Sequence, residues 1–513
     1  MARSALASAP GGLSGGLLLV AGFVLAFSNF MVVLDITIAN VAVTHIAGGL
    51  GASPSEGTWV LTSYAVAEAV CVPLTGWLAK RNGEVKVFVA GMAGFGVFSF
   101  LCGTAGSLGA LVAYRIGQGF CGGPLMPLSQ TLLLRIFPKE KHAMAMGVWS
   151  MTTISAPIFG PILGGTISDN WGWNWIFFIN VPIAVVCSLA AIALLRGSES
   201  RIEKMRIDVV GLLLLVVSVG ALQVLLDLGQ ERDWFGDSFI VALSIISAVA
   251  FVFLIIWELF ERQPIVDLTV FRHRGFTISV TALVLGVGVY FTGMVVIPLW
   301  LQNYLGYTAT WAGNATAFNG IAACLLSPLA AKMSQKMDSR ILVSGGILWL
   351  AVTSLLRVFW WTSDADFWTL ALPGLIQGVG LPFFWVPLTT LALASVDANE
   401  VASAAGVMNF LRVMASAVAT AVGVTLWQNG SRSTGDALTS VLNGASQTMQ
   451  SLQAHGLSFE QARQVVAQQV ESQATVISMN AISVLSAVIF LLAAAIMWLA
   501  PKPKHAVEGG GGH

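Results

Sequence analysis

Apolar stretches of about twenty residues, the length that crosses the roughly 30 Å hydrocarbon core of a bilayer as a helix, recur along nearly the whole chain. Hydrophobic residues make up 56% of the 513 residues and charged residues only 10%. That composition leaves too little polar surface to cover a soluble fold of this size. We therefore expect an all-α polytopic membrane protein embedded in a lipid bilayer. The expected spans, about fourteen in number, are residues 15–38, 57–79, 85–106, 108–132, 142–166, 175–195, 208–227, 238–259, 276–302, 310–333, 340–361, 366–393, 400–427 and 476–499.

Basic residues are distributed unevenly between the two sets of predicted loops. With the N-terminus in the cytoplasm, only Arg232, Arg432 and Arg463 fall in outside loops. The positive-inside rule therefore predicts that both termini are cytoplasmic. The formal net charge of zero gives no reason to expect nucleic acid or an acidic partner. The inside loops and the tail carry Lys80, Arg81, Lys86, Arg135, Lys139, Lys141, Arg196, Arg201, Lys204, Arg206, Arg262, Arg272, Arg274, Lys332, Lys336, Arg340, Lys502 and Lys504.

The sequence contains an internal repeat. "TWVLTSYAVAEAVCVPLTGWLAKRNGEVKVFVAG" in the second and third spans resembles "TWAGNATAFNGIAACLLSPLAAKMSQKMDSRILVSGG" in the tenth and eleventh, and "GQGFCGGPLMPLSQT" in the fourth resembles "IQGVGLPFFWVPLTT" in the twelfth. Parallel halves of this kind are a transporter arrangement, with the substrate site near the midplane between them. The alternative is that any two apolar helices look alike. We expect a 6+2+6 division: a six-helix bundle at 1–196, an inserted pair at 197–274, a second six-helix bundle at 275–499 that includes an outer loop at 428–475, and a cytoplasmic tail at 500–513.

Two acidic residues, Asp35 and Glu68, lie well inside predicted spans, where an unpaired charge costs at least a few kcal/mol. With about 1.5 Å of rise per residue, both lie between the midplane and the outer face, at a depth similar to that of Arg115 in the fourth span. Mutual pairing would lower the cost of burial, and a buried carboxylate near an arginine responds to solvent access and to that contact. The hypothesis is that Asp35 or Glu68 accepts a proton from outside and that Arg115 is the counter-charge. The alternative is a static ion pair that holds helices together.

Four motifs are similar to those of a known group of transporters. "GWLAKRNGEVK", from Gly76 to Lys86, resembles the loop between helices two and three of the major facilitator superfamily, and "YRIGQGFCGG" resembles its helix-four arginine motif. "APIFGPILGG" resembles the helix-five motif of antiporters, and "LDITIANVA" is similar to the helix-one signature of the fourteen-helix drug:proton antiporters. The likeness covers nearly the whole chain and is greatest to EmrB-like multidrug efflux transporters.

The resemblance implies a major facilitator fold that exports small hydrophobic drugs or uncouplers from a bacterial inner membrane in exchange for protons. It also implies two partners, a periplasmic membrane-fusion adaptor and an outer-membrane channel, in a tripartite pump. In the loop motif, it implies a cytoplasmic gating role for Gly76, Lys80, Arg81, Gly83 and Lys86. Lys80 departs from the family pattern, which usually has an acidic residue there, so the usual charge pairing of this loop is not expected to form in the same way.

The fifth span carries the helix-five motif residues Pro157, Gly160, Pro161, Gly164 and Gly165. Small residues on one face let another helix approach closely, and prolines remove backbone donors and permit bending. We interpret the motif as a hinge and packing seam at the interface between the halves. Tight packing without a mechanical role is the alternative.

Aromatic and polar residues of the spans are candidates for a drug pocket, because apolar, adaptable walls accept many ligands. The alternative for each aromatic residue is contact with lipid. Arg412 has no acidic partner in the C-terminal half, so we expect it to face the cavity and attract anionic groups, or to bond to carbonyl groups. Arg357 lies near the outer end of its span and is expected to extend to the membrane surface. The candidates are Phe30, Asn40, Tyr64, Gln118, Tyr290, Phe291, Gln377, Phe384, Asn409 and Arg412.

The long polar outer loop contains one amphipathic stretch, "SFEQARQVVAQQV". Ser458 is the expected N-cap with Gln461 three residues later, followed by Val465, Val466 and Val470 on one face. We expect a helix outside the membrane there. Its role is either docking of the periplasmic adaptor or a lid over the outer mouth.

A membrane-embedded enzyme is the rival class of function. The histidines are scattered, and neither HExxH nor GxxxxGK[ST] occurs, so we expect no catalytic residues, no metal site and no cofactor. The five cysteines lie in apolar stretches without CxxC spacing and are expected to act as small hydrophobic residues. Within transport, a lipid or fatty-acid exporter and a nutrient importer stay open, because fold does not dictate cargo.

Overall fold

The computed structural model describes residues 15–200, 202, 206–230, 232–363, 365–440 and 445–501. In this part of the chain every regular element is helical and no strand occurs, which confirms the all-α prediction. The expected basic residues Arg201, Lys204, Lys502 and Lys504 lie outside the described residues, as does the predicted tail after residue 501.

Helices occupy all fourteen expected ranges. Within the described residues, eleven helices are individually long and apolar enough to cross a bilayer, and the bent region at 139–171 would make a twelfth, so the full number of fourteen spans stays a prediction. Short elements lie between the spans: α2 (Pro54–Gly57), η1 (Lys139–Lys141), η2 (Trp234–Gly236), η3 (Leu268–Arg272) and α17 (Ala445–Ala454). The helices of the expected spans are α1 (Gly16–Gly49), α3 (Trp59–Asn82), α4 (Glu84–Gly103), α5 (Leu108–Gly122) with α6 (Leu125–Ile136), α7 (His142–Trp171), α8 (Trp175–Phe178) with α9 (Asn180–Leu195), α10 (Val209–Leu228), α11 (Ser238–Phe260), α12 (Arg274–Tyr304), α13 (Ala309–Ser334), α14 (Ser339–Trp360), α15 (Phe367–Ala394), α16 (Val401–Ser440) and α18 (Phe459–Met497).

The fourth expected span is broken between α5 and α6. Pro124 is the N-cap of α6 and has no N–H to donate to the preceding turn. Glycines before the break let α5 approach α3 closely. A Cβ on Gly123 would lie 2.9 Å from the Cβ of Cys71, and one on Gly119 would lie 2.6 Å from the carbonyl oxygen of Tyr64. The break therefore leaves the polar face of α5 pressed against α3.

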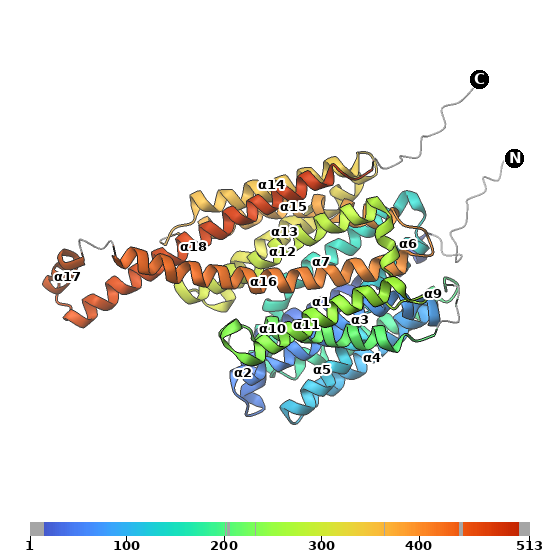
Figure 1. The fold of residues 1–513 in the computed structure, drawn as a ribbon, viewed down its shortest axis with the longest axis horizontal. Helices are drawn as coiled ribbons and strands as arrows, with labels where there is room; N and C mark the ends of the chain where they lie inside the picture. The colour runs from blue at the N-terminus through green and yellow to red at the C-terminus, as the bar shows by residue number, and fades with distance from the viewer. Residues whose placement is uncertain are drawn as a thin grey trace, which may run out of the picture.

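The helices form an elongated bundle in which two groups pack side by side (Figure 1). In the first group α1 packs on α7, α3 on α5, and α4 on α5 and α9. In the second group α13 and α14 pack on α15, and α12 and α18 pack on α16. Fully buried aromatic side chains fill both groups, including Phe95 and Trp149 in the first and Phe276 and Phe490 in the second.

The two groups close on each other at one end of the bundle, which we call the basic end. It comprises the last turns of α3 and α6, the first turns of α4 and α16, and η3. There a Cβ on Gly76 of α3 would lie 2.7 Å from the Cα of Ser403 on α16. A Cβ on Gly147 of α7 would lie 2.6 Å from the Cβ of Ala331 on α13. These contacts leave no passage between the groups at those points.

The helices of the expected inserted pair, α10 and α11, pack on each other, and α10 also packs on α3. Trp257 of α11 donates from Nε1 to Oδ2 of Asp208, the N-cap residue of α10, at 2.9 Å. In the most apolar 18-residue stretch of α11 only 22% of the residues are buried inside the bundle, against 78% in that of α3. α11 is therefore a peripheral helix, and α10 lies between it and the first group.

The expected outer loop is smaller than predicted, because both flanking helices continue into it. α16 extends to Ser440 and α18 begins at Phe459, so the stretch predicted as a separate amphipathic helix is the first part of the last long helix. The predicted N-cap is confirmed: Ser458 N donates to Gln461 Oε1 at 2.8 Å, and Gln461 N donates to Ser458 Oγ at 3.2 Å. The two helices project beyond the bundle at the end opposite the basic end, where α17 joins them (Figure 1).

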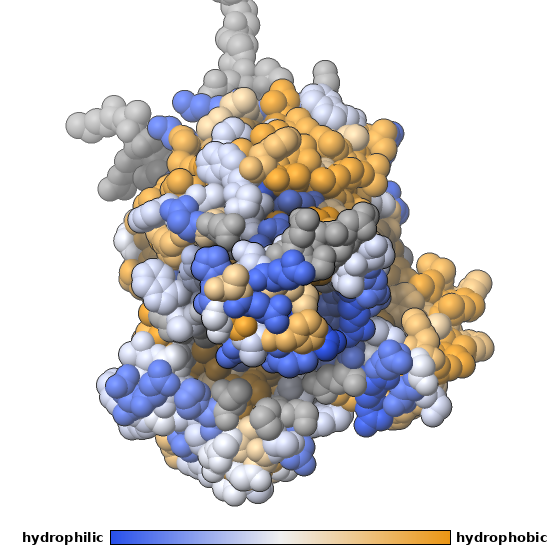
Figure 2. Space-filling model, turned by 90° about the vertical axis from the view of Figure 1, so that its left-hand side faces the viewer, coloured by the Kyte–Doolittle hydropathy of each residue, from blue (hydrophilic) through white to orange (hydrophobic). Residues whose placement is uncertain are grey.

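The projecting helices enclose a cavity of about 780 Å³ that Val466 and Val470 help to line, whereas Val465 is 44% exposed. Seen from this end, hydrophilic residues gather at the centre and hydrophobic residues on the flanks (Figure 2). This distribution is that of a bundle with an apolar perimeter in lipid and a polar end in water.

Candidate proton-coupling site

Asp35 of α1 and Arg115 of α5 form a buried ion pair. Arg115 Nη1 lies 2.6 Å from Asp35 Oδ2, and both side chains are only 1% exposed. The structure therefore brings together the two charges that the sequence placed at similar depth. Each charge is compensated by the other inside the bundle, which lowers the cost of burying them.

Two amides complete the surroundings of the Asp35 carboxylate. Asn180 of α9 donates from Nδ2 to Asp35 Oδ1 at 2.6 Å, and Gln118 of α5 donates from Nε2 to the same oxygen at 3.1 Å. Asn180 also donates to Ser99 Oγ of α4 at 3.2 Å. The carboxylate thus accepts hydrogen bonds from three donors, Arg115, Gln118 and Asn180. The sequence analysis missed Asn180 and Ser99; the signal for Asn180 was an amide within the otherwise apolar "WIFFINVPI".

Arg115 is held by a second set of contacts on α3 and α5. Its Nε donates to the carbonyl oxygen of Val60 at 3.1 Å, and its Nη1 also donates to Gln118 Oε1 at 2.8 Å. The guanidinium carbon lies 4.2 Å from the centre of the Tyr64 ring, a cation–π contact. Groups from α1, α3 and α5 thus hold one guanidinium. A movement of any of these helices would therefore alter the geometry of the ion pair.

Glu68 is placed differently from Asp35. Its carboxylate makes no hydrogen bond or ion pair within the part of the chain that the structure describes, and the charges that act on it are those of Arg412, Arg115 and Asp35. The side chain is 8% exposed and lines a cavity of about 340 Å³. The two acids therefore differ in access: Asp35 is enclosed by protein donors, and Glu68 faces a space large enough for water.

The Glu68 cavity is bounded by the first group and by α10. Asn40, Tyr64 and Arg115 line it from α1, α3 and α5, and Gln223 and Asp227 line it from α10. Gln223 Nε2 donates to Asp227 Oδ1 at 3.1 Å. The sequence analysis gave α10 no role, and the structure shows that its last turns supply polar groups to this cavity.

Arg412 and Asn409 of α16 reach from the second group to the first. Asn409 donates from Nδ2 to Gln130 Oε1 of α6 at 2.7 Å. Arg412 is 8% exposed, contacts the sulfur of Met126 on α6, and lies 5.9 Å from the Trp385 ring centre. The acidic influence on Arg412 comes from Glu68 in the first group, which the search for a partner in its own half had missed.

Arg357 of α14 does not extend to the membrane surface, which corrects the expectation from the sequence. It is 7% exposed and donates from Nη2 to Gln377 Oε1 of α15 at 2.5 Å. Asn319 of α13 donates to the same oxygen at 3.2 Å, and Tyr290 of α12 lines the adjoining cavity. The reason is that the long side chain can turn inward to an amide acceptor.

The remaining aromatic candidates pack mainly against other rings. Phe384 is 0% exposed and lies against Trp385, with ring centres 5.9 Å apart. Phe291 contacts Tyr290 edge-to-face at 5.7 Å, and Phe30 stacks on Phe27 at 5.6 Å. Phe384 is thus placed as a core residue, and a role in substrate binding stays a prediction for all three.

The loop between α3 and α4 forms a cluster of contacts at the basic end. Lys80 Nζ lies 3.3 Å from Asp267 Oδ2, in the segment that precedes η3, so the lysine that departs from the family pattern has an acidic partner of its own. Gly83 has a φ of +94°, which favours glycine. Arg81 lies 5.1 Å from the Trp77 ring centre, and Lys86 N donates to Glu199 Oε2 at 3.2 Å. Gly76 forms the close contact with Ser403 described above.

The glycine face of the helix-five motif packs inside the first group, which differs from the predicted seam between halves. A Cβ on Gly160 would lie 2.2 Å from Thr37 Oγ1 of α1, and one on Gly164 would lie 3.1 Å from the Ile38 carbonyl oxygen, whereas Gly165 has open space. Pro157 instead lines a small cavity shared with α12 and α13. The helix bends by 48° between Pro157 and Ile162, a stretch that includes Pro161. Pro157 therefore faces the second group, on which α7 also packs through α13, so a role of the motif at the seam between the halves stays a prediction.

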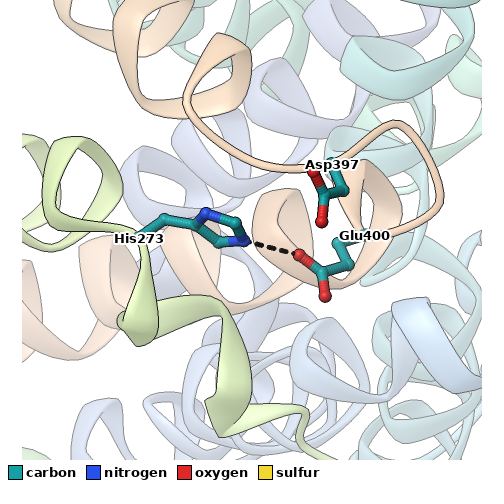
Figure 3. A group of neighbouring side chains, drawn as sticks. All are labelled: His273, Asp397 and Glu400. Carbon is teal, nitrogen blue, oxygen red and sulfur yellow. Dashed lines mark hydrogen bonds and ion pairs between the residues drawn. The ribbon is translucent and has the colours of Figure 1, made fainter.

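A group of ionisable side chains at the basic end joins the end of η3 to the segment between α15 and α16 (Figure 3). His273 Nε2 lies 2.8 Å from Glu400 Oε2. Arg272 Nη2 lies 2.7 Å from Glu400 Oε1 and 3.2 Å from Asp397 Oδ2. Arg272 supplies positive charge to both carboxylates. We therefore interpret Arg272, His273, Asp397 and Glu400 as an ion-pair cluster that links the two segments, and we call it the clasp.

A membrane-embedded helical bundle made of two packed groups, with a buried carboxylate–arginine pair beside a cavity, has the architecture of a secondary transporter. The family model described as Major Facilitator Superfamily matches residues 25–420, and the chain belongs to that superfamily. Its apolar helices and family membership make it a multi-pass protein of the bacterial inner membrane.

Curated relatives match nearly end to end. The chain is 45% identical over 504 residues to "Multidrug export protein EmrB" of Escherichia coli (strain K12), with 98% of each chain covered. It is 43% identical over 493 residues to "Fatty acid resistance protein FarB" of Neisseria gonorrhoeae, covering 95% of this chain and 97% of the relative. Both similarities support the family assignment independently of the structure.

Solved structures share the fold. The proton:xylose symporter XylE bound to 6-bromo-6-deoxy-D-glucose superposes with a TM-score of 0.56 at 16% identity, covering 94% of this chain and 96% of XylE. The human organic anion transporter MFSD10 gives a TM-score of 0.58 at 14% identity, covering 93% of this chain and 99% of that chain. Identities this low establish the major facilitator fold alone.

Proposed function

We propose that this chain is a proton-coupled multidrug exporter that moves small hydrophobic drugs or uncouplers outward as protons move inward by alternating access. The observation that carries the proposal is the Asp35–Arg115 ion pair beside the Glu68 cavity. The near full-length similarity to multidrug export proteins supports the cargo class. The superfamily consists of transporters, so transport rather than catalysis is the proposed activity.

Glu68 is the proposed first proton acceptor. Its carboxylate faces a cavity and has no hydrogen-bonding partner within the described residues, so water can deliver a proton to it. Asp35 is the proposed switch, because protonation of that carboxylate would release its hold on Arg115. A proton that enters down the membrane potential contributes about 2.3 kcal/mol per 100 mV, enough to bias two conformations of similar energy.

Alternating access would require the contacts at the basic end to open. We propose that the two helix groups act as six-helix halves over 1–196 and 275–499, with α10 and α11 inserted between them in sequence at 197–274. Lys80–Asp267 and the clasp then hold the inner gate in its closed state. Both termini are proposed to be cytoplasmic on the basis of the basic loops.

The projecting parts of α16 and α18 are the proposed contact for a periplasmic adaptor, which would connect to an outer-membrane channel. The projection and its polar end support docking, and a lid over the outer mouth is the alternative. Deleting residues 445–470 and measuring cross-linking to the adaptor tests this partner. Unchanged cross-linking would exclude docking at this segment.

Export of fatty acids or lipids is a second candidate cargo. The 43% identity to a fatty acid resistance protein and the buried Arg357 favour it over nutrient import. Purified protein in proteoliposomes with a pH-sensitive dye, supplied with lipophilic cations, anions and uncouplers, tests both cargo classes. Substrate-dependent proton release supports antiport, and its absence with every compound would refute the proposed function.

A further inference from the structure

Arg357 is a buried charge without an acidic partner. Its side chain is 7% exposed, and no Asp or Glu occurs within α12, α13, α14 or α15. α18 also lines its cavity, through Ser486 and Phe490, but its two acids, Glu460 and Glu471, lie in the first part of that helix, toward the projecting end.

The other buried arginines among the described residues differ: Arg115 pairs with Asp35, Arg340 pairs with Asp338, and Glu68 supplies the negative charge that acts on Arg412. A buried cation that is not neutralised is costly unless something else compensates it.

A comparison of the two halves through the internal repeat shows that, among the described residues, only the first half has a carboxylate beside the aligned glutamine. "GQGFC" and "IQGVG" align Gln118 of α5 with Gln377 of α15. In the first half Gln118 accepts from Arg115 and donates to Asp35, so the cluster is neutral. In the second half Gln377 accepts from Arg357 and Asn319, and no acid is present in its place, so the cluster carries one positive charge. Each half thus brings an arginine to the aligned glutamine, from α5 itself in the first half and from the neighbouring α14 in the second, and only the second lacks a counter-ion.

The Arg357 guanidinium also has unused donors. An arginine offers five N–H groups, and within the described residues only Nη2 has a hydrogen-bond acceptor. The buried Nε has none. Gly293 of α12 lies beside Nη1: a Cβ built on it would contact that nitrogen at 3.9 Å, so no side chain from this position covers it. These N–H groups can donate hydrogen bonds to an anion in the plane of the guanidinium.

The space beside Arg357 connects to the interface between the helix groups. In this conformation it is a cavity of about 30 Å³ with apolar walls that include Met294 and Phe490. Tyr290, Met294 and Asn319 also line a second cavity of about 20 Å³, which reaches Ile154 and Pro157 of α7. The walls are adaptable, because methionine side chains repack easily. A movement of α7 against α12 and α13 would therefore join Arg357 to the space between the halves.

We propose that Arg357, oriented by Gln377, binds the carboxylate head group of an amphipathic substrate whose apolar chain lies along Tyr290, Met294 and Phe490. The inference deepens the proposed export function, on which it rests for the route of the substrate. The substrate supplies the counter-ion that the second half lacks. Neutral and cationic compounds have no such role at this site.

The test measures binding of three probes with the same chain length to the full-length protein in lipid nanodiscs without a proton gradient. Radiolabelled decanoate, decanamide and decyltrimethylammonium carry similar apolar chains and have anionic, neutral and cationic head groups. Arg357→Gln should weaken decanoate binding about tenfold or more, the effect of removing a charged hydrogen bond, and leave the other two probes unchanged. Arg232→Gln, which removes a half-exposed arginine of the loop between α10 and α11, is the matched control and should change none of them.

Gln377→Glu controls for the case in which Arg357→Gln loses binding only because it does not fold. It places a carboxylate beside Arg357 at the position of the present acceptor, so it should fold at least as stably as the wild type and still lose decanoate binding. Decanoate binding that survives in both Arg357→Gln and Gln377→Glu would overturn the proposal, as would an equal loss of all three probes in a folded variant. Because binding is measured without transport, selective decanoate binding combined with no proton release in proteoliposomes would refute only the proposed antiport.

Discussion

Asn180 Nδ2 lies 2.6 Å from Asp35 Oδ1, on the opposite side of the carboxylate from Arg115. An amide from α9 and a guanidinium from α5 therefore hold one charge on α1. Asp35 therefore contributes to the stability of the fold as well as to the proposed proton coupling. Substitutions can distinguish these two contributions.

Asp35→Asn should abolish substrate-driven proton release and also destabilise the protein, because Arg115 is left as an unpaired buried charge. Breaking one side of a buried pair costs about 3–5 kcal/mol. The double variant Asp35→Asn with Arg115→Gln removes both charges and should recover most of the thermal stability without recovering proton release. Thermal unfolding and dye-reported proton flux measure the two effects. Active transport at the wild-type rate in either variant would reject the assignment of Asp35.

Glu68→Gln should lose proton release with a smaller change in stability than Asp35→Asn. Glu68 has no hydrogen bond or ion pair to lose within the described residues, so the expected loss of unfolding free energy is smaller than the roughly 3–5 kcal/mol of Asp35→Asn. Glu460→Gln, at an exposed residue of α18, is the matched control and should leave proton flux unchanged. Proton flux at the wild-type rate in Glu68→Gln would show that another group is the first proton acceptor.

Lys80→Glu should weaken closure at the basic end, because the new carboxylate repels Asp267. Partly exposed pairs contribute about 0.2–1 kcal/mol, so the closed population should fall measurably and not disappear. Labelling of a Ser403→Cys probe, which lies against Gly76, reports the opening. The exchanged pair Lys80→Glu with Asp267→Lys should restore protection. Equal labelling in all of these variants would show that the ion pair has no part in the gate.

Ser458→Ala should fray the start of α18 and leave the membrane-spanning part intact. Loss of an N-cap costs about 1 kcal/mol, which here acts on one helix end. Hydrogen exchange of the amides at residues 459–462 should accelerate. Thr439→Ala is the control, because Thr439 Oγ1 only donates to the Gly435 carbonyl oxygen within α16. Unchanged exchange in Ser458→Ala would mean that the neighbouring helix, not the cap, holds this end.

Acid should fray α2, the short helix between the first two long ones. The backbone N–H and the hydroxyl of Ser53 hydrogen-bond the Glu56 carboxylate and hold its pKa below the usual range. A lowered pKa in the folded state stabilises the helix above the ordinary pKa of Glu, about 4.3, and the effect is lost as pH falls through the lowered value. Exchange at residues 56–57 should thus accelerate at acidic pH in the wild type, and Glu56→Gln should remove this pH dependence.

The positions of the helices were predictable because apolar length and basic loops are local properties of the sequence. The Asp35–Arg115 contact was also predictable, since two opposite charges at one depth of a bundle have few other partners. The cap at Ser458 followed from a four-residue pattern. In each case the signal lies within one helix or in the cost of burying a charge.

The rest depended on which way each helix is turned. Asn180 and Ser99 are ordinary polar residues in apolar runs until α9 and α4 turn them toward Asp35. Arg357 could extend outward or inward, and the position of Gln377 on a neighbouring helix decides it. The length of α16 was missed because its polar extension is stabilised by packing on α18 rather than by apolar composition. Rotation and packing of this kind are not encoded in any single stretch.

Gly76 has only a hydrogen atom where it meets Ser403. A methyl group added there could not be accommodated while the gate is shut, so a single alanine at this position would act as a permanent wedge between α3 and α16. In such a protein the gate at the basic end could not close fully, although every charge needed for coupling would be present. It would leak protons instead of exporting substrate.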